Sequence, residues 1–302
     1  MGLNLSGMTT ETRNPRTMQL DQMSPLEIVT VMNEEDARVP LAIAKCLPQI
    51  AQAVTWAAES FEKGGRLFYM GAGTSGRLGV LDAAECPPTF GVPKEMVVGL
   101  IAGGEKAFIE AVEGAEDSRE LAVEDLKAHG LTANDFVVGI AASGRTPYVP
   151  GGLDYAKSVG CHTAAIACNI GSAIGKAAEL AIEVNCGPEV LTGSTRLKSG
   201  TAQKLILNMI STGSMVRTGN AYQNLMVDVQ QTNEKLHTRA ENIVIDATGV
   251  EREKARAAID AAGGSVKTAI TMLLADCDAA EAARRLEKAR GHVREAIRLE
   301  VL

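Results

Sequence analysis

The sequence predicts an α/β fold, a three-layer α-β-α sandwich with a five-stranded parallel sheet, flanked by further helices. Two observations support this. Short continuous apolar runs alternate with helical segments through the middle of the chain, as expected for strands buried on both faces. The segments before and after carry apolar residues at spacings of three and four, which is typical of helices.

An N-terminal helical arm is expected over residues 1–56. Ser24 followed by Pro25 matches an N-cap with a proline in the first turn of a helix, and apolar residues recur at helical spacing from there. Pro40 and Pro48 remove backbone donors within this pattern. We therefore expect these two prolines to break or kink the arm.

The sheet domain is expected over residues 57–225. The predicted strands are 67–70, 96–101, 136–140, 163–167 and 180–184. The predicted helices between them lie near 76–85, 106–128, 147–158 and 171–178. Alternation of this kind produces right-handed crossovers and a doubly wound sheet.

A C-terminal helical, UBA-like domain is expected over residues 240–302. Residues 255–270 resemble residues 282–297 at an offset of 27, and each copy has a glycine between two helical patterns. Two helix–glycine–helix units can bury their apolar faces against each other. The mixed charges of this segment favour a solvated bundle over a partner-binding module.

Composition narrows the possible functions. The 302 residues include 30 basic and 37 acidic side chains and only 3% aromatic residues, so no nucleic-acid partner is expected. No apolar stretch is long enough to span a membrane and no signal peptide is recognisable, which predicts a cytoplasmic protein without membrane contact. The six cysteines lack metal-ligand spacing, so no metal is expected.

Three loops that follow predicted strands combine glycine, hydroxyl groups and a cation, at 71–77, 143–146 and 187–201. Ligands of a doubly wound sheet bind beyond the carboxyl ends of its strands, where such loops come together. Backbone N–H groups, helix N-termini and hydroxyls are the donors that a phosphate monoester needs. The expected contacts are Gly73, Thr74, Ser75, Ser143, Gly144, Arg145, Thr146, Ser194 and Lys198.

The first loop also matches the G-x-G-x-x-G pattern of a dinucleotide site, which is the main alternative for this loop. Such a site expects an acidic residue at the end of the second strand to bind the ribose. Here residues 101–104 contain no acid, and Glu105 is the first one. Thr74 and Ser75 fill the variable positions, which favours a single phosphate, so no organic cofactor is expected.

Several carboxylates lie near predicted loops or helix starts and are candidates for proton transfer. They are Asp82, Glu85, Glu113, Glu116, Asp117 and Glu189. Glu85 precedes Pro87 and Pro88, where we expect the helix to stop. That position suits an acid–base residue, and a helix-end charge facing water is the alternative. Spacing alone does not select between Glu113 and Glu116.

Long motifs run through the chain: TETRNP at 10–15, GAGTSGRLG at 71–79, DAAECPPTFG at 82–91, AVEGAED at 111–117, ASGRTPYV at 142–149 and GSTRLKSGTAQK at 193–204. These motifs closely resemble those of the N-acetylmuramic acid 6-phosphate etherase family. That family belongs to the sugar isomerase (SIS) domain superfamily. The resemblance covers nearly the whole chain, including the helical tail, and it implies the SIS fold.

The resemblance implies a carbon–oxygen lyase that removes the D-lactyl group from C3 of N-acetylmuramate 6-phosphate, in recycling of cell-wall sugars. It implies Glu85 and Glu116 as the two acid–base residues, and neither a metal nor a cofactor. Glu189 matches the position where related isomerases place a catalytic carboxylate. Related proteins are homodimers with the site at the subunit interface, so a homodimer is implied here.

Two alternatives stay open. A phosphosugar isomerase would use the same loops to move a proton between C1 and C2 without releasing lactate. A non-catalytic phosphosugar-sensing protein, like the related glucokinase regulatory protein, would need neither glutamate. Glu85 and Glu116 both stand in their motifs, which argues against the sensing protein.

Overall fold

A computed structural model describes residues 7–110, 112–231 and 233–299, and these residues form two compact units. The first unit contains the described residues up to Ala84 together with Glu95–Ser211. The second contains Glu85–Lys94 together with the described residues from Thr212 onward. Motif residue Ala111 and the extreme ends of the predicted arm and tail lie outside the described residues.

The first unit contains a parallel sheet with its strands in the order β2-β1-β3-β4-β5. The strands are β1 (Leu67–Gly71), β2 (Val97–Ile101), β3 (Phe136–Ile140), β4 (His162–Ala167) and β5 (Leu180–Glu183). Every residue of β1 and β3 is buried, as continuous apolar runs predict for central parallel strands. The five-stranded parallel sheet is confirmed, and each predicted strand end is correct to within one residue.

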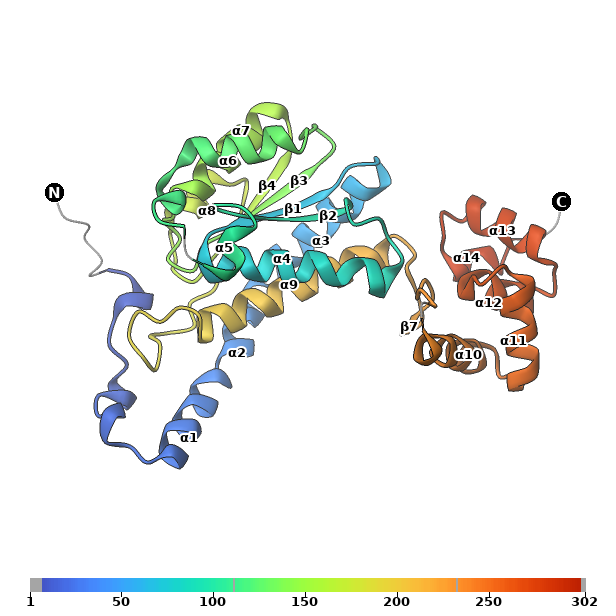
Figure 1. Cartoon of the computed structure of the whole chain (residues 1–302), viewed down its shortest axis with the longest axis horizontal. Coiled ribbons are helices and arrows are strands. Elements are labelled where there is room, and N and C mark those ends of the chain that lie inside the picture. Colours follow the sequence, from blue (N-terminus) through green and yellow to red (C-terminus); the bar gives the residue numbers. More distant parts are fainter. Residues whose placement is uncertain (1–6, 111, 232, 300–302) are drawn as a thin grey trace. The chain divides into compact units, whose positions relative to one another are not determined.

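Helices cover both faces of this sheet, so the predicted three-layer arrangement is confirmed (Figure 1). Helices α6 and α7 lie over one face, and α3 and α4 lie over the other (Figure 1). The helices of this unit are α1 (Pro25–Asp36), α2 (Val39–Ile43), α3 (Leu47–Glu62), α4 (Gly73–Phe90), α5 (Lys106–Ile109), α6 (Arg119–Ala128), α7 (Tyr148–Val159), α8 (Ala173–Ala177) and α9 (Lys198–Arg217). The unit boundaries fall inside α4 and α9. Phe68 and Met70 pack with Tyr148 and Leu153 of α7 in a core from which water is excluded.

The N-terminal segment is divided into helices by its prolines, as the sequence predicted. Ser24 caps α1 in a capping box with Glu27, and Pro25 occupies the first turn. Pro40 and Pro48 stand in the first turns of α2 and α3. Proline is tolerated there because the N–H groups of a first turn have no partner within the helix.

Two predicted helix boundaries are wrong. The single helix predicted over 106–128 is two helices, α5 and α6, separated by a loop with a 3₁₀ turn at Ala115–Asp117. Gly114 has a φ of 77°, a left-handed conformation that a continuing α-helix does not contain. Helix α4 also runs through Pro87 and Pro88 to Phe90, although the sequence predicted a stop at these prolines.

Tertiary contacts within the second unit explain why α4 continues. The prolines remove two donors from the last turn of the helix, which weakens that turn. Phe90 is buried, its carbonyl accepts a hydrogen bond from Asn220 at 3.3 Å, and the Gly91 N–H donates to the Pro87 carbonyl at 2.9 Å. These contacts stabilise the end of α4, and a local sequence pattern does not contain them.

The rest of the second unit is a helical bundle preceded by a short antiparallel ribbon. The ribbon consists of β6 (Ala221–Tyr222) and β7 (Leu225–Met226). The helices are α10 (Glu234–Thr248), α11 (Arg252–Ala261), α12 (Val266–Ala275), α13 (Ala279–Lys288) and α14 (Val293–Ala296). The helix–glycine–helix repeat is confirmed, because glycines separate α11 from α12 and α13 from α14. Asp228 ties this bundle to its ribbon by accepting from Lys267 at 2.6 Å and Asn220 at 3.1 Å.

We expect Gly91→Ala to destabilise the second unit more than Gly249→Ala. Both glycines follow a helix with a left-handed φ, of 65° and 73°, so both substitutions cost about 1–2 kcal/mol of strain. A Cβ on Gly91 would also lie 2.5 Å from the Asp228 carbonyl oxygen, whereas nothing lies within 4 Å of one on Gly249. The added crowding should cost about 1–3 kcal/mol more in urea unfolding. Equal losses would contradict this reading of the Asp228 contact.

Candidate functional site

The register of the sheet brings the loops at its carboxyl edge to one level. Gly71 at the end of β1 pairs with Ile101 of β2 on one side and with Ile140 of β3 on the other. Ile140 in turn pairs with Ile166 of β4. The loops that follow these four strands therefore begin side by side, which is where ligands of such sheets bind.

The first loop leads directly into the N-terminus of α4. Gly73 begins the helix and Thr74 and Ser75 follow in its first turn. Ser75 is buried, and its hydroxyl donates to the Gln203 side chain of α9 at 3.0 Å. The hydroxyl of the half-buried Thr74 and the N–H groups of this first turn are then the donors suited to an anion.

The loop at Ser143–Thr146 is positioned by Asn169, a residue that our sequence analysis missed. Asn169 follows β4, is 7% exposed, and donates to the carbonyls of Ala142 and Ser143 at 3.4 and 3.2 Å. It also exchanges hydrogen bonds with Thr10 of the N-terminal motif. The available signal was a polar residue two positions after the end of the fourth predicted strand.

Gly144 is required in this loop for a steric reason. Its φ is 74°, and a Cβ there would lie only 2.4 Å from the Cβ of Ser172. Ser143 and Thr146 are half-buried on either side of it, whereas Arg145 is exposed. The loop therefore presents its hydroxyl residues on a backbone that only glycine allows.

The loop before α9 is organised around the carboxylate of Glu189, which is fully buried. This carboxylate accepts from the N–H groups of Lys198 and Ser199, each at 2.9 Å, and from the Ser199 hydroxyl at 2.8 Å. Both of its oxygens therefore cap the N-terminus of α9, where a negative charge is stabilised by the helix dipole. Ser194 lies half-buried in the same loop.

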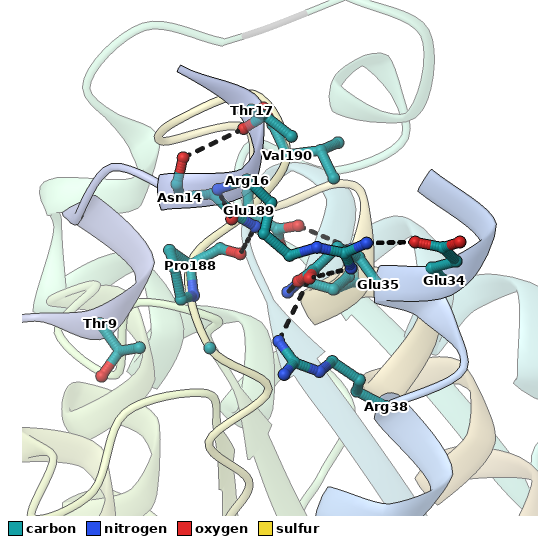
Figure 2. A network of polar contacts seen from close by, with 12 residues as sticks. Thr9, Asn14, Arg16, Thr17, Glu34, Glu35, Arg38, Pro188, Glu189 and Val190 are labelled. Atoms are coloured by element: carbon teal, nitrogen blue, oxygen red, sulfur yellow. Dashed lines mark hydrogen bonds and ion pairs between the residues drawn. The ribbon is translucent and has the colours of Figure 1, made fainter. Parts of the chain in front are cut away.

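Lys198 uses its ammonium group on the N-terminal arm. Its Nζ lies 2.6 Å from Oε2 of Glu35 on α1, and both side chains are 1% exposed. Figure 2 shows the surrounding network, in which Arg16 and Arg38 also contact Glu35, at 3.0 and 3.2 Å, and Arg16 contacts Glu34. The arm is thereby connected to the start of α9.

The electrostatics of Glu35 follow from these contacts. Burial by itself would raise the pKa of the Glu35 carboxyl, but the hydrogen bonds from Lys198 and Arg16 outweigh burial and keep that pKa below its ordinary value of 4.5. Glu35 is therefore a carboxylate at neutral pH.

A cavity of about 160 Å³ lies beyond the ends of β1 and β2. Its lining residues are Ala72, Gly73, Arg77, Ala102, Ala107, Val112, Glu113, Gly114 and Glu116. The cavity brings Gly73, in the loop at 71–77 that is expected to bind phosphate, together with two carboxylates on the loop between α5 and α6. Because Glu113 and Glu116 both line the cavity, the lining does not show which of the two is the acid–base residue.

The structure places the predicted site residues in three ways. Gly73 and Glu116 share the cavity, while the loop at Ser143–Thr146 lies at the same sheet edge. Glu189 and Lys198 have their charged groups in buried contacts within the chain. Glu85 lies on α4 with an exposed side chain.

The described residues contain no group of three or more His, Cys, Asp or Glu side chains that could bind a metal ion. Over the same part of the chain, no helix is both long and apolar enough to cross a bilayer.

Comparison with known proteins assigns the family. Residues 49–157 match the model of the glucokinase regulatory protein N-terminal SIS domain. The chain is 62% identical to an N-acetylmuramic acid 6-phosphate etherase of Exiguobacterium sp., with 97% of this chain and 100% of the relative covered. It is 61% identical to the etherase of Serratia proteamaculans, with 98% and 99% covered. The chain belongs to the N-acetylmuramic acid 6-phosphate etherase family.

The etherase family resemblance noted in the sequence motifs is therefore confirmed, and so is the SIS fold. A solved structure from Bacteroides fragilis, described as a candidate phosphosugar isomerase involved in capsule formation, matches with a TM-score of 0.51. It covers 67% of this chain and 95% of the other at 21% identity, so the likeness shows the fold alone.

We expect Glu35→Leu to destabilise this etherase family member by about 3–5 kcal/mol, because it leaves the buried Lys198 ammonium without its carboxylate. Glu34→Leu is the matched control. Glu34 is adjacent, but its side chain is 51% exposed and pairs with Arg16 at the surface, so its loss should cost less than about 1 kcal/mol. In Glu35→Leu/Lys198→Met the buried charge is absent and most stability should return. Urea unfolding of the full chain measures all three, and equal losses at positions 34 and 35 would contradict this account.

The same pair predicts a pH dependence. The pKa of Glu35 is lower in the folded chain than its ordinary value of 4.5. The contribution of Glu35 to the free energy of unfolding is therefore complete above pH 4.5 and is lost as the pH falls through the folded pKa. Acid unfolding of the wild type should therefore include a loss that the Glu35→Leu/Lys198→Met variant lacks. If the free energies of unfolding of the two proteins fell in parallel below pH 4.5, the loss could not be assigned to Glu35.

Proposed function

We propose that this protein cleaves the D-lactyl ether of N-acetylmuramic acid 6-phosphate, releasing D-lactate and N-acetylglucosamine 6-phosphate, as a carbon–oxygen lyase in cell-wall amino sugar recycling. The observation that carries the proposal is the cavity that joins Gly73, at the start of α4, to Glu116. It occurs in a chain that matches named etherases over 97% or more of its length. The reaction needs a phosphate anchor and proton-transferring carboxylates. The cavity joins the anchor to Glu116, and Glu85, which does not line the cavity, is proposed as the second carboxylate.

The 6-phosphate is assigned to the N-terminus of α4 and the neighbouring loop at the carboxyl edge of the sheet. The proposed contacts are Gly73, Thr74, Ser75, Ser143, Gly144, Arg145, Thr146 and Ser194. Lys198 was also expected among these contacts, and Glu189 was expected as a carboxylate acting on the substrate, but the charged groups of both bond within the chain. We assign these two residues to positioning α9 and the loop that precedes it.

Two carboxylates are sufficient for the chemistry, without a metal or cofactor. Opening of the sugar ring exposes an aldehyde at C1, which acidifies the proton on C2. Glu116 removes that proton, the C3–O bond breaks, and Glu85 protonates the departing lactate oxygen. Glu85, now a carboxylate, takes a proton from water as the water oxygen adds to C3 of the unsaturated aldehyde, and Glu116 returns its proton to C2, which gives the product and restores both carboxyl groups. Phosphate binding keeps the substrate in place through both stages.

Glu116→Gln should lower the rate of lactate release by about 10²–10⁴, because it removes the proposed base at C2. Glu113→Gln is a control on the same cavity wall and should retain the rate to within about ten-fold, because a hydrogen bond outside the chemistry contributes about 0.5–1.5 kcal/mol. Both rates are measured with purified protein by an enzymatic lactate assay. A larger loss at Glu113 than at Glu116 would reverse the assignment of the base.

Glu85→Gln should separate the two halves of the reaction. With Glu116 intact, the C2 hydrogen should still exchange with deuterated water, while lactate release falls by about 10²–10⁴ for want of the acid. NMR of the sugar and the lactate assay measure the two steps, and Glu116→Gln should lose both. Lactate release at the wild-type rate from Glu85→Gln would contradict the proposed role.

The lactate assay also distinguishes the alternatives. An isomerase would interconvert the aldose and ketose phosphate without releasing lactate, and a sensing protein of the glucokinase-regulator kind would bind phosphosugar without turnover. The family-model match to that regulator covers residues 49–157 alone, whereas the etherases match 97% or more of the chain. The etherase reaction is therefore the one that we propose.

We further propose a cytoplasmic homodimer with the site at the subunit interface. The arm supports this, because α1 and α2 expose the apolar side chains Leu26, Val29 and Leu41 at 73%, 57% and 71%. Exposed apolar surface of this kind is typical of protein–protein contact. In domain terms, we propose an arm at 1–56, a SIS domain at 57–225 and a helical tail at 240–302.

A further inference from the structure

Arg77 stands out in the candidate site because none of the proposed steps uses it. It lies on α4 one turn after Gly73, is half-buried, and lines the same cavity as Glu116. Among the described residues that line this cavity, Arg77 alone carries a positive charge. The other charged residues of the lining are Glu113 and Glu116.

The guanidinium of Arg77 is oriented by the backbone next to it. Its Nε–H donates to the Phe108 carbonyl at 2.7 Å, and its Nη2 donates to the Ala107 carbonyl at 2.8 Å. Both carbonyls belong to the short helix α5. An arginine immobilised in this way loses little conformational entropy when it binds a ligand.

These two bonds leave donors available. Both N–H groups of Nη1 take no part in them, and within the described part of the chain Arg77 forms no ion pair with a carboxylate. A guanidinium presents its N–H groups as a planar fork whose geometry matches a carboxylate. The cavity therefore contains a fixed cation that is suited to an anionic group of a ligand.

The proposed substrate has two anionic groups, and the loops account for one of them. The phosphate is assigned to the α4 N-terminus and the loop at Ser143–Thr146. The second anion is the carboxylate of the lactyl group on C3, next to the carbon from which Glu116 takes its proton. Without a cation, this carboxylate would meet two like charges, Glu113 and Glu116, in one small cavity.

We propose that Arg77 binds the carboxylate of the lactyl group and thereby makes the site selective for 3-O-lactyl sugars, an inference that rests on the proposed function. Arg77 acts on the substrate and on the departing lactate. The sugar product has no carboxylate at C3, so its binding does not depend on Arg77. Arg77 is thus a specificity residue, distinct from the phosphate contacts and from the two acid–base glutamates.

The test compares N-acetylmuramic acid 6-phosphate with its neutral lactyl amide, following formation of N-acetylglucosamine 6-phosphate from each. A charge-assisted hydrogen bond to a carboxylate should make wild-type kcat/KM about 10- to 100-fold lower for the amide. In Arg77→Met the two substrates should react at similar, low kcat/KM values. Arg77→Lys keeps the charge without the fork and should show an intermediate preference.

This ratio separates recognition from structural support. If Arg77 only supported α5, or bound the phosphate, Arg77→Met would lower kcat/KM equally for the acid and for its amide. The wild-type preference for the acid would then remain, and that result would overturn the proposal. Lys106→Met is the matched control: it removes a cation from α5 that does not line the cavity, and it should leave the preference unchanged.

A binding measurement keeps this inference distinguishable from the proposed function. Calorimetry on the full chain carrying Glu116→Gln, which should not cleave the lactyl sugar during the titration, compares N-acetylmuramic acid 6-phosphate with N-acetylglucosamine 6-phosphate. In this protein the lactyl sugar should bind at least about ten-fold more tightly, and adding Arg77→Met should remove that difference while affinity for the product changes less than about two-fold. If the wild type released no lactate, the proposed function would fail, yet an Arg77-dependent difference in affinity would still support lactyl recognition. A difference that survives in Arg77→Met would overturn it.

Discussion

The level register of the parallel strands is the constraint on which the candidate site depends. Gly71, Ile101 and Ile140 lie opposite one another at the ends of three strands, so the chain leaves the sheet at one height in three places. Segments more than 60 residues apart in sequence therefore begin next to each other. Parallel strands require crossover helices, and one such helix, α4, starts with its N–H groups at this edge.

Two buried carboxylates connect this edge to the rest of the first unit. Glu189 caps the N-terminus of α9, and Glu35 brings α1 of the arm against Lys198 at the same helix start (Figure 2). Charged groups are stable at such depth only when they are paired and hydrogen-bonded, and both carboxylates meet that condition. The positions of the arm and of the loop before α9 therefore depend on each other.

The sequence predicted well wherever a signal was local. The five strands, the Ser24 cap and the tail repeat each follow from residue patterns within a few turns, and each was correct. The helix predicted over 106–128 was wrong for a local reason, the left-handed backbone at Gly114, whereas the other errors arose where distant contacts override local preference. Helix α4 continues through Pro87 because contacts from Asn220 and the burial of Phe90 support its last turn. Asn169 was missed because its role, bridging the loop at Ser143 to the N-terminal motif, has no counterpart in neighbouring residues.

The sequence by itself determined the fold class, the phosphate-type loops and, through its long motifs, the family, because all of these are written in contiguous residues. Tertiary structure alone decided which charged groups remain available to a ligand. In the sequence, the charges of Glu189 and Lys198 look equally suitable for binding a ligand. In the structure, both charged groups are bonded to buried groups of the chain itself. Arg77 and Glu116, 39 positions apart, share a cavity because the two strand ends preceding them are paired. Availability depends on partners that are distant in sequence, and folding alone brings them together.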